Sequence, residues 1–175
     1  LYPGNEALLY EIAIPGIIPV FDLMHRYEKF PEIADTVIFR KRELHYKRVC
    51  RYAQAILVDS EVGKMQLLES YEVDEKKVFE LSYVAPSYVT REWDINIAER
   101  YCLPEKFIFY PAQFWEHKNH IRLLEAIHIL AAEKNLIVNV VLVGSAKNAD
   151  DQIMEYIQIK NLSSQVFMLS YVSNE

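Results

Sequence analysis

Short apolar runs alternate along the chain with longer stretches in which apolar positions recur at helical spacing. The short runs predict strands, and they cover residues 14–21, 55–58, 78–84, 107–110, 138–143 and 166–169. The stretches between them predict helices over residues 33–53, from the cap-forming pair 59–60 to residue 71, over 121–134 and over 149–160. Because strands that alternate with helices form βαβ units, we predict an α/β fold with parallel sheets that helices cover on both faces.

The same alternation occurs on both sides of residues 87–106, a stretch without clean periodicity that contains Pro104. We therefore predict two doubly wound, Rossmann-like domains, each only partly present. Residues 1–86 belong to the first domain, residues 87–106 connect the two, and residues 107–175 belong to the second. Residues 22–31, which are rich in His, Arg and Tyr, are predicted to form a loop.

The predicted helix over residues 33–53 is amphipathic and basic. At about 100° per residue, one side collects mostly apolar residues, namely Ile38, Phe39, Tyr46, Val49, Cys50 and Ala53. The other side collects cations around Leu44, namely Arg40, Lys41, Lys47, Arg48 and Arg51. Arg42 is an exception, because it falls inside the apolar arc. A face of this kind over residues 40–51 either is solvated or makes peripheral contact with an anionic membrane, and both alternatives are open. RNA contact is less favoured.

Composition and charge narrow the class of protein. The 175 residues are 51% hydrophobic, which excludes disorder, and the formal charge of −6 argues against a general nucleic-acid binder. No apolar stretch approaches the roughly 20 residues that span a bilayer, so a cytoplasmic protein is expected. Cys50 and Cys102 are expected to be reduced thiols. No spacing of Cys and His indicates a metal site. The chain opens at Leu1 as if in mid-sequence, so we expect a piece of a longer protein.

Residues 107–127, "FIFYPAQFWEHKNHIRLLEAI", run from a predicted strand into a predicted helix. In an open α/β sheet, ligands bind beyond the carboxyl ends of the strands, where helix N-termini with unpaired N–H groups favour an anion. Lys118 adds an ammonium suited to a phosphate, and Asn119 is predicted to cap the helix that starts at His120. The corner between this strand and this helix therefore suits a phosphate. The alternative is that Lys118 and His117 are only solvated and that Asn119 is only a cap.

The next predicted strand ends in Gly144-Ser145, at the same edge of the sheet. A glycine there lets the backbone approach a ligand closely. An ordinary glycine at the end of a strand is equally compatible with this feature alone.

Three segments of the second half, "FIFYPAQFWEHKNHIRLLEAIHIL", "VVLVGS" and "VFMLSYVSNE", resemble the donor-binding domain of family-4 retaining glycosyltransferases, which have the GT-B fold. Upstream, "VFDLMHRYEKFPEI" and "AILVDSEVGKMQLLESYEVDEKKVFELSYVAP" resemble the second half of the acceptor-side domain of that family. The resemblance covers most of the chain, with the blocks in the family's order. It implies transfer of a sugar from a nucleoside-diphosphate sugar to a sugar or lipid-linked hydroxyl acceptor with retention of configuration, without a cofactor.

The resemblance also implies roles for individual residues. Lys118 matches the family's lysine on the donor diphosphate, and Gly144 matches its glycine after the second strand. Where the family often has an arginine in the first loop, this chain offers Gln113 or His117. We therefore expect the nucleotide sugar to be bound by residues of both loops, namely Gln113, His117, Lys118, Asn119, Gly144 and Ser145.

On the acceptor side, the family tends to have a His-Asp pair after a strand, and this chain has Phe21-Asp22 there. His25, three residues on, is the candidate for the sugar-facing histidine, with ordinary hydrogen bonding as the alternative. The family's paired glutamates and its glycine-rich loop are expected outside residues 1–175, so these residues alone are expected to be inactive. A nucleotide-sugar epimerase of similar fold and a non-catalytic GT-B binding domain are the alternative functions.

Overall fold

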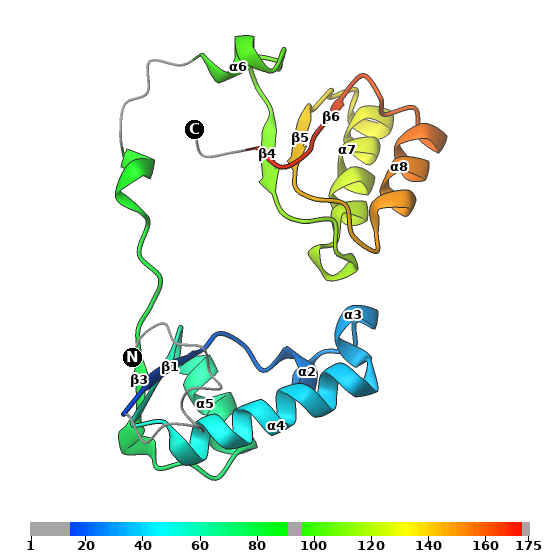
Figure 1. Ribbon diagram of the computed structural model, residues 1–175. Helices are drawn as coiled ribbons and strands as arrows, with labels where there is room; N and C mark the ends of the chain where they lie inside the picture. Colours follow the sequence, from blue (N-terminus) through cyan, green and yellow to red (C-terminus); the bar gives the residue numbers. More distant parts are fainter. Residues whose placement is uncertain (1–14, 91–95, 173–175) are drawn as a thin grey trace. The chain divides into compact units, whose positions relative to one another are not determined.

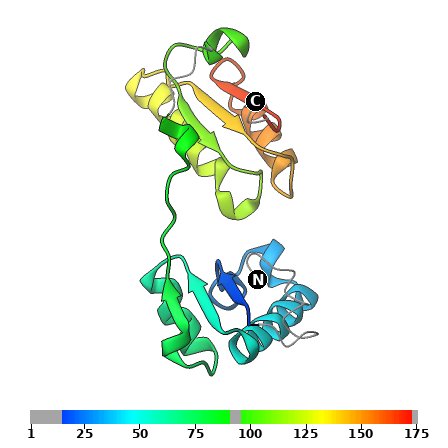
Figure 2. The same ribbon diagram turned by 60° about the vertical axis from the view of Figure 1, so that its left-hand side comes forward.

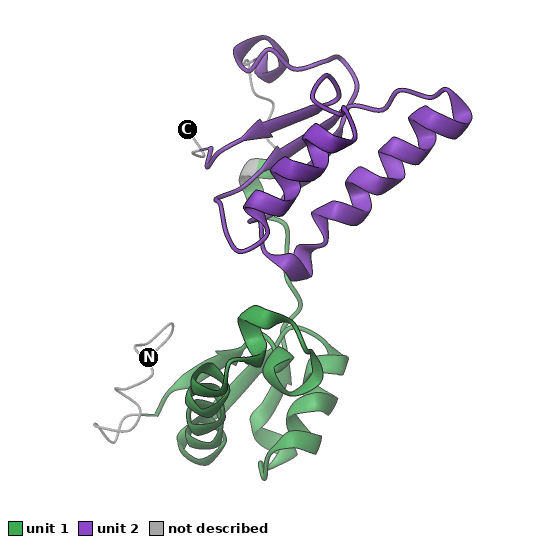
Figure 3. Ribbon diagram, turned by 90° about the vertical axis from the view of Figure 1, so that its right-hand side faces the viewer, with its two compact units in different colours: residues 1–91 green, residues 92–175 purple. Residues whose placement is uncertain are grey.

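A computed structural model describes residues 15–90 and 96–172 of the chain. The chain divides into two compact units, residues 1–91 and residues 92–175 (Figure 3). The division lies inside the predicted connection, residues 87–106. Each unit has its own sheet and its own core.

Unit 1 is built around a three-stranded parallel sheet in the order β1-β2-β3 (Figures 1 and 2). Its strands and α-helices are β1 (Ile17–Val20), α2 (Met24–Tyr27), α3 (Pro31–Ala34), α4 (Thr36–Tyr52), β2 (Ala55–Val58), α5 (Glu61–Ser70) and β3 (Val78–Glu80). Short 3-10 helices are η1 (Glu75–Lys77) and η2 (Ser87–Thr90). The register places Ile18 beside Ile56 and Ile56 beside Val78.

Unit 2 repeats this pattern, with strand order β4-β5-β6, all parallel. Its elements are α6 (Ile97–Arg100), β4 (Ile108–Pro111), η3 (Glu116–Lys118), α7 (His120–Lys134), β5 (Val140–Val143), α8 (Asp150–Ile159) and β6 (Val166–Leu169). Leu124 and Ile127 of α7 pack with Ile153 of α8 against Leu142, and all four side chains are buried. Figure 1 shows α7 and α8 on the same side of the strands.

In each unit, two long helices pack on one face of the sheet, α4 and α5 in unit 1 and α7 and α8 in unit 2. On the other face of the unit 2 sheet, Ile97 of α6 lines a pocket with Val141 and Leu169, so the predicted cover of both faces is present there only in part. In unit 1, Val49 of α4 and Leu67 of α5 pack with Ile18, Ile56 and Val78 in a single core. Phe79, the residue of β3 after Val78, lies on the other face of the sheet and is exposed. The strand order explains why the helices between the strands share one face. Each crossover moves to the next strand in the same direction, and right-handed crossovers then place every crossover helix on the same face.

The strands were predicted more accurately than the connections. Strands 55–58 and 166–169 have the predicted bounds, whereas the strand predicted over 78–84 ends at Glu80. The prediction of a loop over residues 22–31 is wrong, because α2 and the start of α3 lie there. The helix predicted from Ile33 begins at Thr36, because the Asp35 carboxylate accepts hydrogen bonds from the N–H groups of Val37 and Ile38 at 2.8 and 2.9 Å and caps the helix there.

Two further expectations concern thiols and membranes. Cys50 and Cys102 are both free, and burial raises the pKa of the Cys50 thiol to about 11. None of the helices in residues 15–90 and 96–172 is long and apolar enough to cross a bilayer.

Candidate functional site

The carboxyl edge of the unit 2 sheet brings together two loops, residues 112–119 after β4 and residues 144–149 after β5. Gly144 is the point of closest approach between them. A Cβ built on Gly144 would lie 2.3 Å from the carbonyl oxygen of Ala112 and 2.9 Å from the Cα of Gln113. The backbone that this glycine admits is therefore the chain's own first loop. This gives Gly144 a structural reason besides the predicted approach of a ligand.

Hydrogen bonds hold the two loops together. The N–H group of Phe114 donates to the carbonyl oxygen of Ser145 at 3.1 Å, and the carbonyl oxygen of Phe114 accepts from the N–H group of Ala149 at 3.0 Å. The N–H group of Glu116 donates to Oδ1 of Asn148 at 3.0 Å. Because both loops are tied at several points, the chain at the start of α7 is held in one conformation by the rest of the corner.

Lys118 is the last residue of η3, and its side chain is exposed. Its carbonyl oxygen accepts a hydrogen bond from the Tyr110 hydroxyl at 2.7 Å, which fixes its backbone to β4. Asn119 occupies the N-cap position of α7, as predicted, but its side chain makes no capping bond. Its backbone is left-handed, with φ 56° and ψ 39°, a conformation that asparagine tolerates better than most residues. Asn119 therefore acts here through its backbone conformation.

His120, the first residue of α7, packs beneath the loop after β4 and was not among the predicted site residues. It is buried, and its ring contacts the rings of Tyr110 and Phe114 at centroid distances of 4.9 and 5.1 Å. Burial, together with the nearby Lys118 ammonium, lowers the pKa of His120 below its usual value. The neutral ring then packs as part of the core. Its position one residue after a cap gave no sign of this contact, which depends on the path of residues 110–114.

Of the other residues predicted to bind the nucleotide sugar, Gln113 and His117 lie in the first loop and Ser145 lies in the second. Gln113 is exposed, and its Oε1 accepts a hydrogen bond from the Trp115 indole at 2.9 Å. His117 is half-buried in η3. The structure also adds a cation that the sequence analysis missed, because Nζ of Lys147, in the second loop, lies 5.1 Å from the centre of the Trp115 ring. Only the packing of the two loops places Lys147 against the first one.

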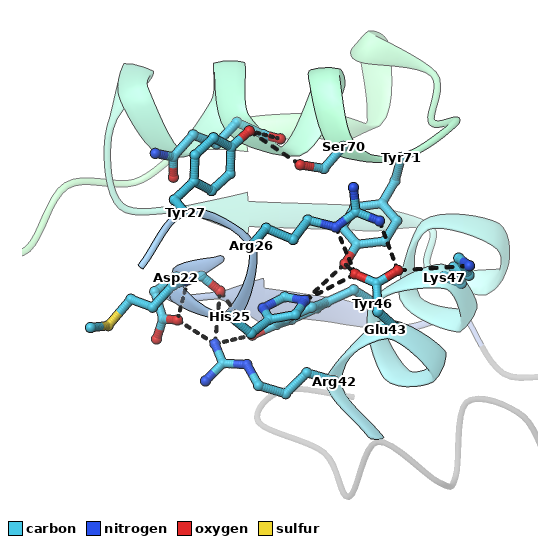
Figure 4. A network of polar contacts seen from close by, with 12 residues as sticks. Asp22, His25, Arg26, Tyr27, Arg42, Glu43, Tyr46, Lys47, Ser70 and Tyr71 are labelled. Carbon is cyan, nitrogen blue, oxygen red and sulfur yellow. Dashed lines mark hydrogen bonds and ion pairs between the residues drawn. The ribbon is translucent and has the colours of Figure 1, made fainter. Parts of the chain in front are cut away.

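A second cluster of polar side chains lies in unit 1, beside the carboxyl end of β1 (Figure 4). Its centre is the Glu43 carboxylate of α4, which is 13% exposed. Arg26 donates to it through Nε at 2.6 Å and through a terminal nitrogen at 2.7 Å, and the Tyr71 hydroxyl donates at 2.8 Å. His25 Nε2 lies 3.0 Å from the same carboxylate. A carboxylate only accepts hydrogen bonds, so Nε2 carries the proton of the neutral ring.

Arg42, the cation that fell inside the apolar arc of the predicted helix, also has a polar partner in this cluster. It forms an ion pair with Asp22, the second residue after β1, and donates to the Tyr46 hydroxyl at 3.2 Å. Tyr46 in turn donates to the carbonyl oxygen of Asp22 at 2.9 Å. Two neighbouring side chains of α4, Arg42 and Glu43, therefore hold the segment that follows β1 (Figure 4).

These contacts define the surroundings of His25, the predicted sugar-facing residue. Its side chain has 0% exposure, and its ring packs near Phe39 and Tyr46 with centroid distances of 5.4 Å to each. The ring is therefore enclosed by protein in this structure. The sugar-facing role remains a prediction, and the ordinary hydrogen-bonding role has its partners in Glu43 and Tyr71.

The cluster predicts that unit 1 loses stability on mild acidification. Burial is the main cause that lowers the pKa of His25 below its usual value of 6.5, and Arg42 and Arg26 act in the same direction against Glu43. The unfolded chain therefore takes up the proton first. Stability is complete above about pH 6.5 and declines as the pH falls below it. We expect the urea midpoint of unit 1, followed by amide hydrogen exchange, to fall between pH 7 and pH 5.

The matched variant His25→Gln lacks the titrating ring. Its unit 1 midpoint should vary less than the wild-type midpoint over the same pH range, whatever its absolute stability. Unit 2 is the internal reference. It contains His120, whose pKa is also lowered, so its midpoint should change with pH equally in the wild type and in the variant. An equal decline of unit 1 in the variant would assign the pH dependence to other groups.

Comparison with known proteins adds the family context. Residues 98–175 match the family model of glycosyl transferases group 1. No curated protein matches the chain. Among solved structures, TarM of S. aureus is similar over 91% of this chain and 29% of TarM, with 18% identity and a TM-score of 0.65. Anabaena Alr3699/HepE in complex with UDP and glucose is similar over 97% and 46%, with 13% identity and a TM-score of 0.66.

WaaG, a glycosyltransferase involved in lipopolysaccharide biosynthesis, is similar over 93% of this chain and 47% of its own length, with 12% identity and a TM-score of 0.66. The chain thus spans less than half the length of each of these three proteins. At such identities the likeness shows the fold. Residues 98–175 therefore match glycosyl transferases group 1, and the chain has part of the GT-B fold of these glycosyltransferases.

Proposed function

We propose that the chain is part of a retaining glycosyltransferase that moves a sugar from a nucleoside diphosphate to a hydroxyl group of a sugar or lipid-linked acceptor. The observation that carries the proposal is the corner of unit 2, where an exposed lysine and the start of a 15-residue helix lie at the carboxyl edge of a parallel sheet. The family match covers this corner, and the fold of the whole chain agrees with it.

In the proposed reaction, the bond between the anomeric carbon and the diphosphate oxygen breaks, and a bond to the acceptor oxygen forms as the acceptor loses its proton. Negative charge grows on the leaving diphosphate. Cations and N–H groups already in place stabilise that charge without reorganising. We assign this role to the Lys118 ammonium and to the N–H groups of α7 that precede Arg122. The N–H group of Arg122 itself already donates to the carbonyl oxygen of Asn119 at 3.2 Å. Lys147, at the same edge, is the second cation available to it.

The first nucleotide to test is UDP. Alr3699/HepE has been seen with UDP and glucose, and the pneumococcal O-GlcNAc transferase GtfA with UDP and GlcNAc.

We assign His25 the role of holding the segment after β1. Asp22 and Phe21 are the residues of this segment that lie at the carboxyl edge of the first sheet. Phe21 is exposed there, in the position where a family member tends to have histidine.

The test is a thermal-shift screen of UDP, GDP, ADP and their sugar conjugates against the wild type, Lys118→Ala and Lys134→Ala. Lys134 is the matched control, because it is exposed at the opposite end of the same helix. A ligand at about 100 times its Kd stabilises the native state by about 2.7 kcal/mol. We expect one nucleotide to shift the melting temperature of the wild type and of Lys134→Ala, and the shift to disappear in Lys118→Ala.

An undiminished shift in Lys118→Ala would remove this lysine from the site, and no shift with any nucleotide would contradict the proposed donor site. Where sugar transfer by the longer protein is measured, Lys118→Ala should lower turnover on the order of 10²-fold, as loss of one oxyanion donor does.

A non-catalytic binding domain is the second candidate, because Phe21 replaces the expected histidine and the His25 ring is covered. The two candidates differ in the fate of the bound sugar nucleotide. A glycosyltransferase releases the nucleoside diphosphate in the presence of an acceptor, and a binding domain leaves the conjugate intact. An epimerase would interconvert the conjugate with no acceptor added.

A further inference from the structure

A cavity of about 200 Å³ opens in unit 2 between the N-terminal ends of α7 and α8. The two helices lie on the same side of the strands (Figure 1), and their buried side chains share one core. Among the residues that line the cavity are Glu116, Asn119, His120, Ile121, Gln152 and Ile153. Of the residues that the structure describes, neither Lys118 nor Lys147 lines it. The cavity thus borders the corner proposed for the diphosphate but has none of its cations.

His120 is the feature of this cavity that packing alone does not explain. It is 1% exposed, and neither of its ring nitrogens has a hydrogen-bond partner among the described residues. Burial lowers the pKa of the ring below its usual value, so at pH 7 the ring is neutral and offers one N–H donor and one acceptor. The Ala112 carbonyl acts on this pKa in the opposite direction, but it makes no hydrogen bond of normal geometry to the ring. Because a buried polar group without a partner costs free energy, we expect an occupant of the cavity to pair with the ring.

The other polar side chains of the cavity are acidic or neutral. Glu116 supplies a carboxylate, which only accepts hydrogen bonds, and Asn119 and Gln152 supply amides, which both donate and accept. The Asn119 side chain makes no capping bond to α7. Ile121 and Ile153 add apolar surface. The cavity therefore offers several donors and acceptors beside an apolar wall.

This combination favours a neutral, hydroxyl-rich ligand over an ion. The positive ends of two helix dipoles oppose a cation, while Glu116, together with Asp150 and Asp151 in the first turn of α8, opposes an anion. A hydroxyl group both donates and accepts, so it can pair with either tautomer of His120. The volume is below the roughly 300–1,000 Å³ of pockets that take drug-sized ligands, so it suits a single sugar ring.

We propose that this cavity binds one ring of a neutral saccharide. A hydroxyl group of the ring pairs with a nitrogen of His120, and neighbouring hydroxyl groups pair with Gln152 and Asn119. One face of the ring packs on Ile121 and Ile153. Unit 2 then holds one sugar residue of a glycan beside the corner, without a nucleotide and without Lys118. This binding does not depend on the proposed sugar transfer.

The test is a titration of the ¹⁵N-labelled chain with D-glucose, N-acetylglucosamine or inorganic phosphate, without nucleotide. The signals followed are the side-chain amide of Gln152 and the ring nitrogens of His120. One ring in so small a cavity is expected to bind with a Kd on the order of 1 mM. We expect both signals to shift with at least one saccharide and not with phosphate. The same titrations of Lys118→Ala exclude binding at the corner, and the saccharide response should persist in that variant.

Gln152→Ala removes one amide from the cavity and should raise the Kd of the saccharide, read from the His120 ring signals, roughly tenfold, as expected for one lost hydrogen bond. Gln158→Ala is the matched control, because it makes the same change at an exposed position of the same helix outside the cavity. It should bind as the wild type does. Because the Gln152 side chain is exposed, its removal should leave the fold intact.

His120→Phe keeps a ring between Tyr110 and Phe114 but has no ring nitrogen. The Gln152 signal should then no longer shift with either saccharide. The variant should melt no lower than the wild type without ligand, because no buried polar group is left without a partner.

Four results would overturn the proposal. Without any shift by either saccharide, the cavity holds only water. Equal Kd values for Gln152→Ala and Gln158→Ala would place the saccharide elsewhere. The same shifts with phosphate in Lys118→Ala would make the cavity an anion site. Loss of the saccharide response in Lys118→Ala would make the cavity part of the corner.

Discussion

Gly144→Ala is expected to destabilise unit 2 by about 3 kcal/mol or more, at the upper end of the range for an added methyl group in a tightly packed place. The new Cβ would lie 2.3 Å from the carbonyl oxygen of Ala112, and backbone atoms cannot turn aside as the end of a side chain can. Either β5 or the loop after β4 must shift. Because that loop positions Lys118, nucleotide-dependent stabilisation should fall as well.

Gly63→Ala is the control for the same chemical change. Gly63 lies in α5, and a Cβ there would meet the side-chain Oδ1 of Asp59 at 3.0 Å, which a small rotation relieves. Alanine also favours a helix over glycine by roughly 0.5–1 kcal/mol, so this variant should be neutral or stabilising. Urea denaturation of both, with amide exchange to separate the units, is the measurement. A loss under about 1 kcal/mol for Gly144→Ala would show that the two loops can separate at small cost.

The corner was predictable from the sequence because its main signals are local. An apolar run that ends before Lys118-Asn119 and a second that ends at Gly144 place both loops at one edge, since parallel strands share a carboxyl end. What these patterns lack is the contact between the loops. The reason for Gly144 lies in Ala112, 32 residues earlier, and Lys147 meets Trp115 only through that packing. Neither relation has a periodicity to detect.

The unit 1 cluster was less predictable for the same physical reason. His25 was read as a loop residue, yet it lies in a short helix whose polar partners are 18 and 46 residues away, Glu43 and Tyr71. A four-residue helix is too short for a hydrophobic period, and tertiary hydrogen bonds stabilise it in place of intrinsic propensity. Arg42 within the apolar arc was the one visible sign that a polar partner faces α4, and its partner is Asp22.

Glu43→Gln is expected to destabilise unit 1 by about 3 kcal/mol at pH 7, which is the lower part of the range for removing one partner of a buried ion pair. The lower part applies because Arg26, the main partner, is 30% exposed and regains some water. Glutamine keeps the volume of the side chain but replaces one acceptor with an N–H donor that faces the Arg26 guanidinium. Tyr71 and His25 also lose a charged acceptor.

The same carboxylate should dominate the acid limb of the stability profile. The hydrogen bonds from Arg26, ahead of those from Tyr71 and His25, lower the pKa of Glu43 from 4.5 to about 2. Its contribution is therefore complete above pH 4.5 and is lost as the pH falls toward 2. Glu43→Gln should lose much less stability than the wild type between pH 4.5 and pH 2.5 in urea titrations.

Glu75→Gln is the matched control, because Glu75 also forms an ion pair in unit 1, with Lys64 at 2.8 Å, but is 68% exposed. An exposed pair is worth well under about 1 kcal/mol, so this variant should unfold as the wild type does at pH 7. If the two variants lost equal stability, the position of Glu43 among His25, Arg26 and Tyr71 would have no special effect. The segment after β1 would then be held mainly by Arg42 and Tyr46, and the double variant Glu43→Gln/Arg42→Gln would show nearly all of its loss in Arg42→Gln alone.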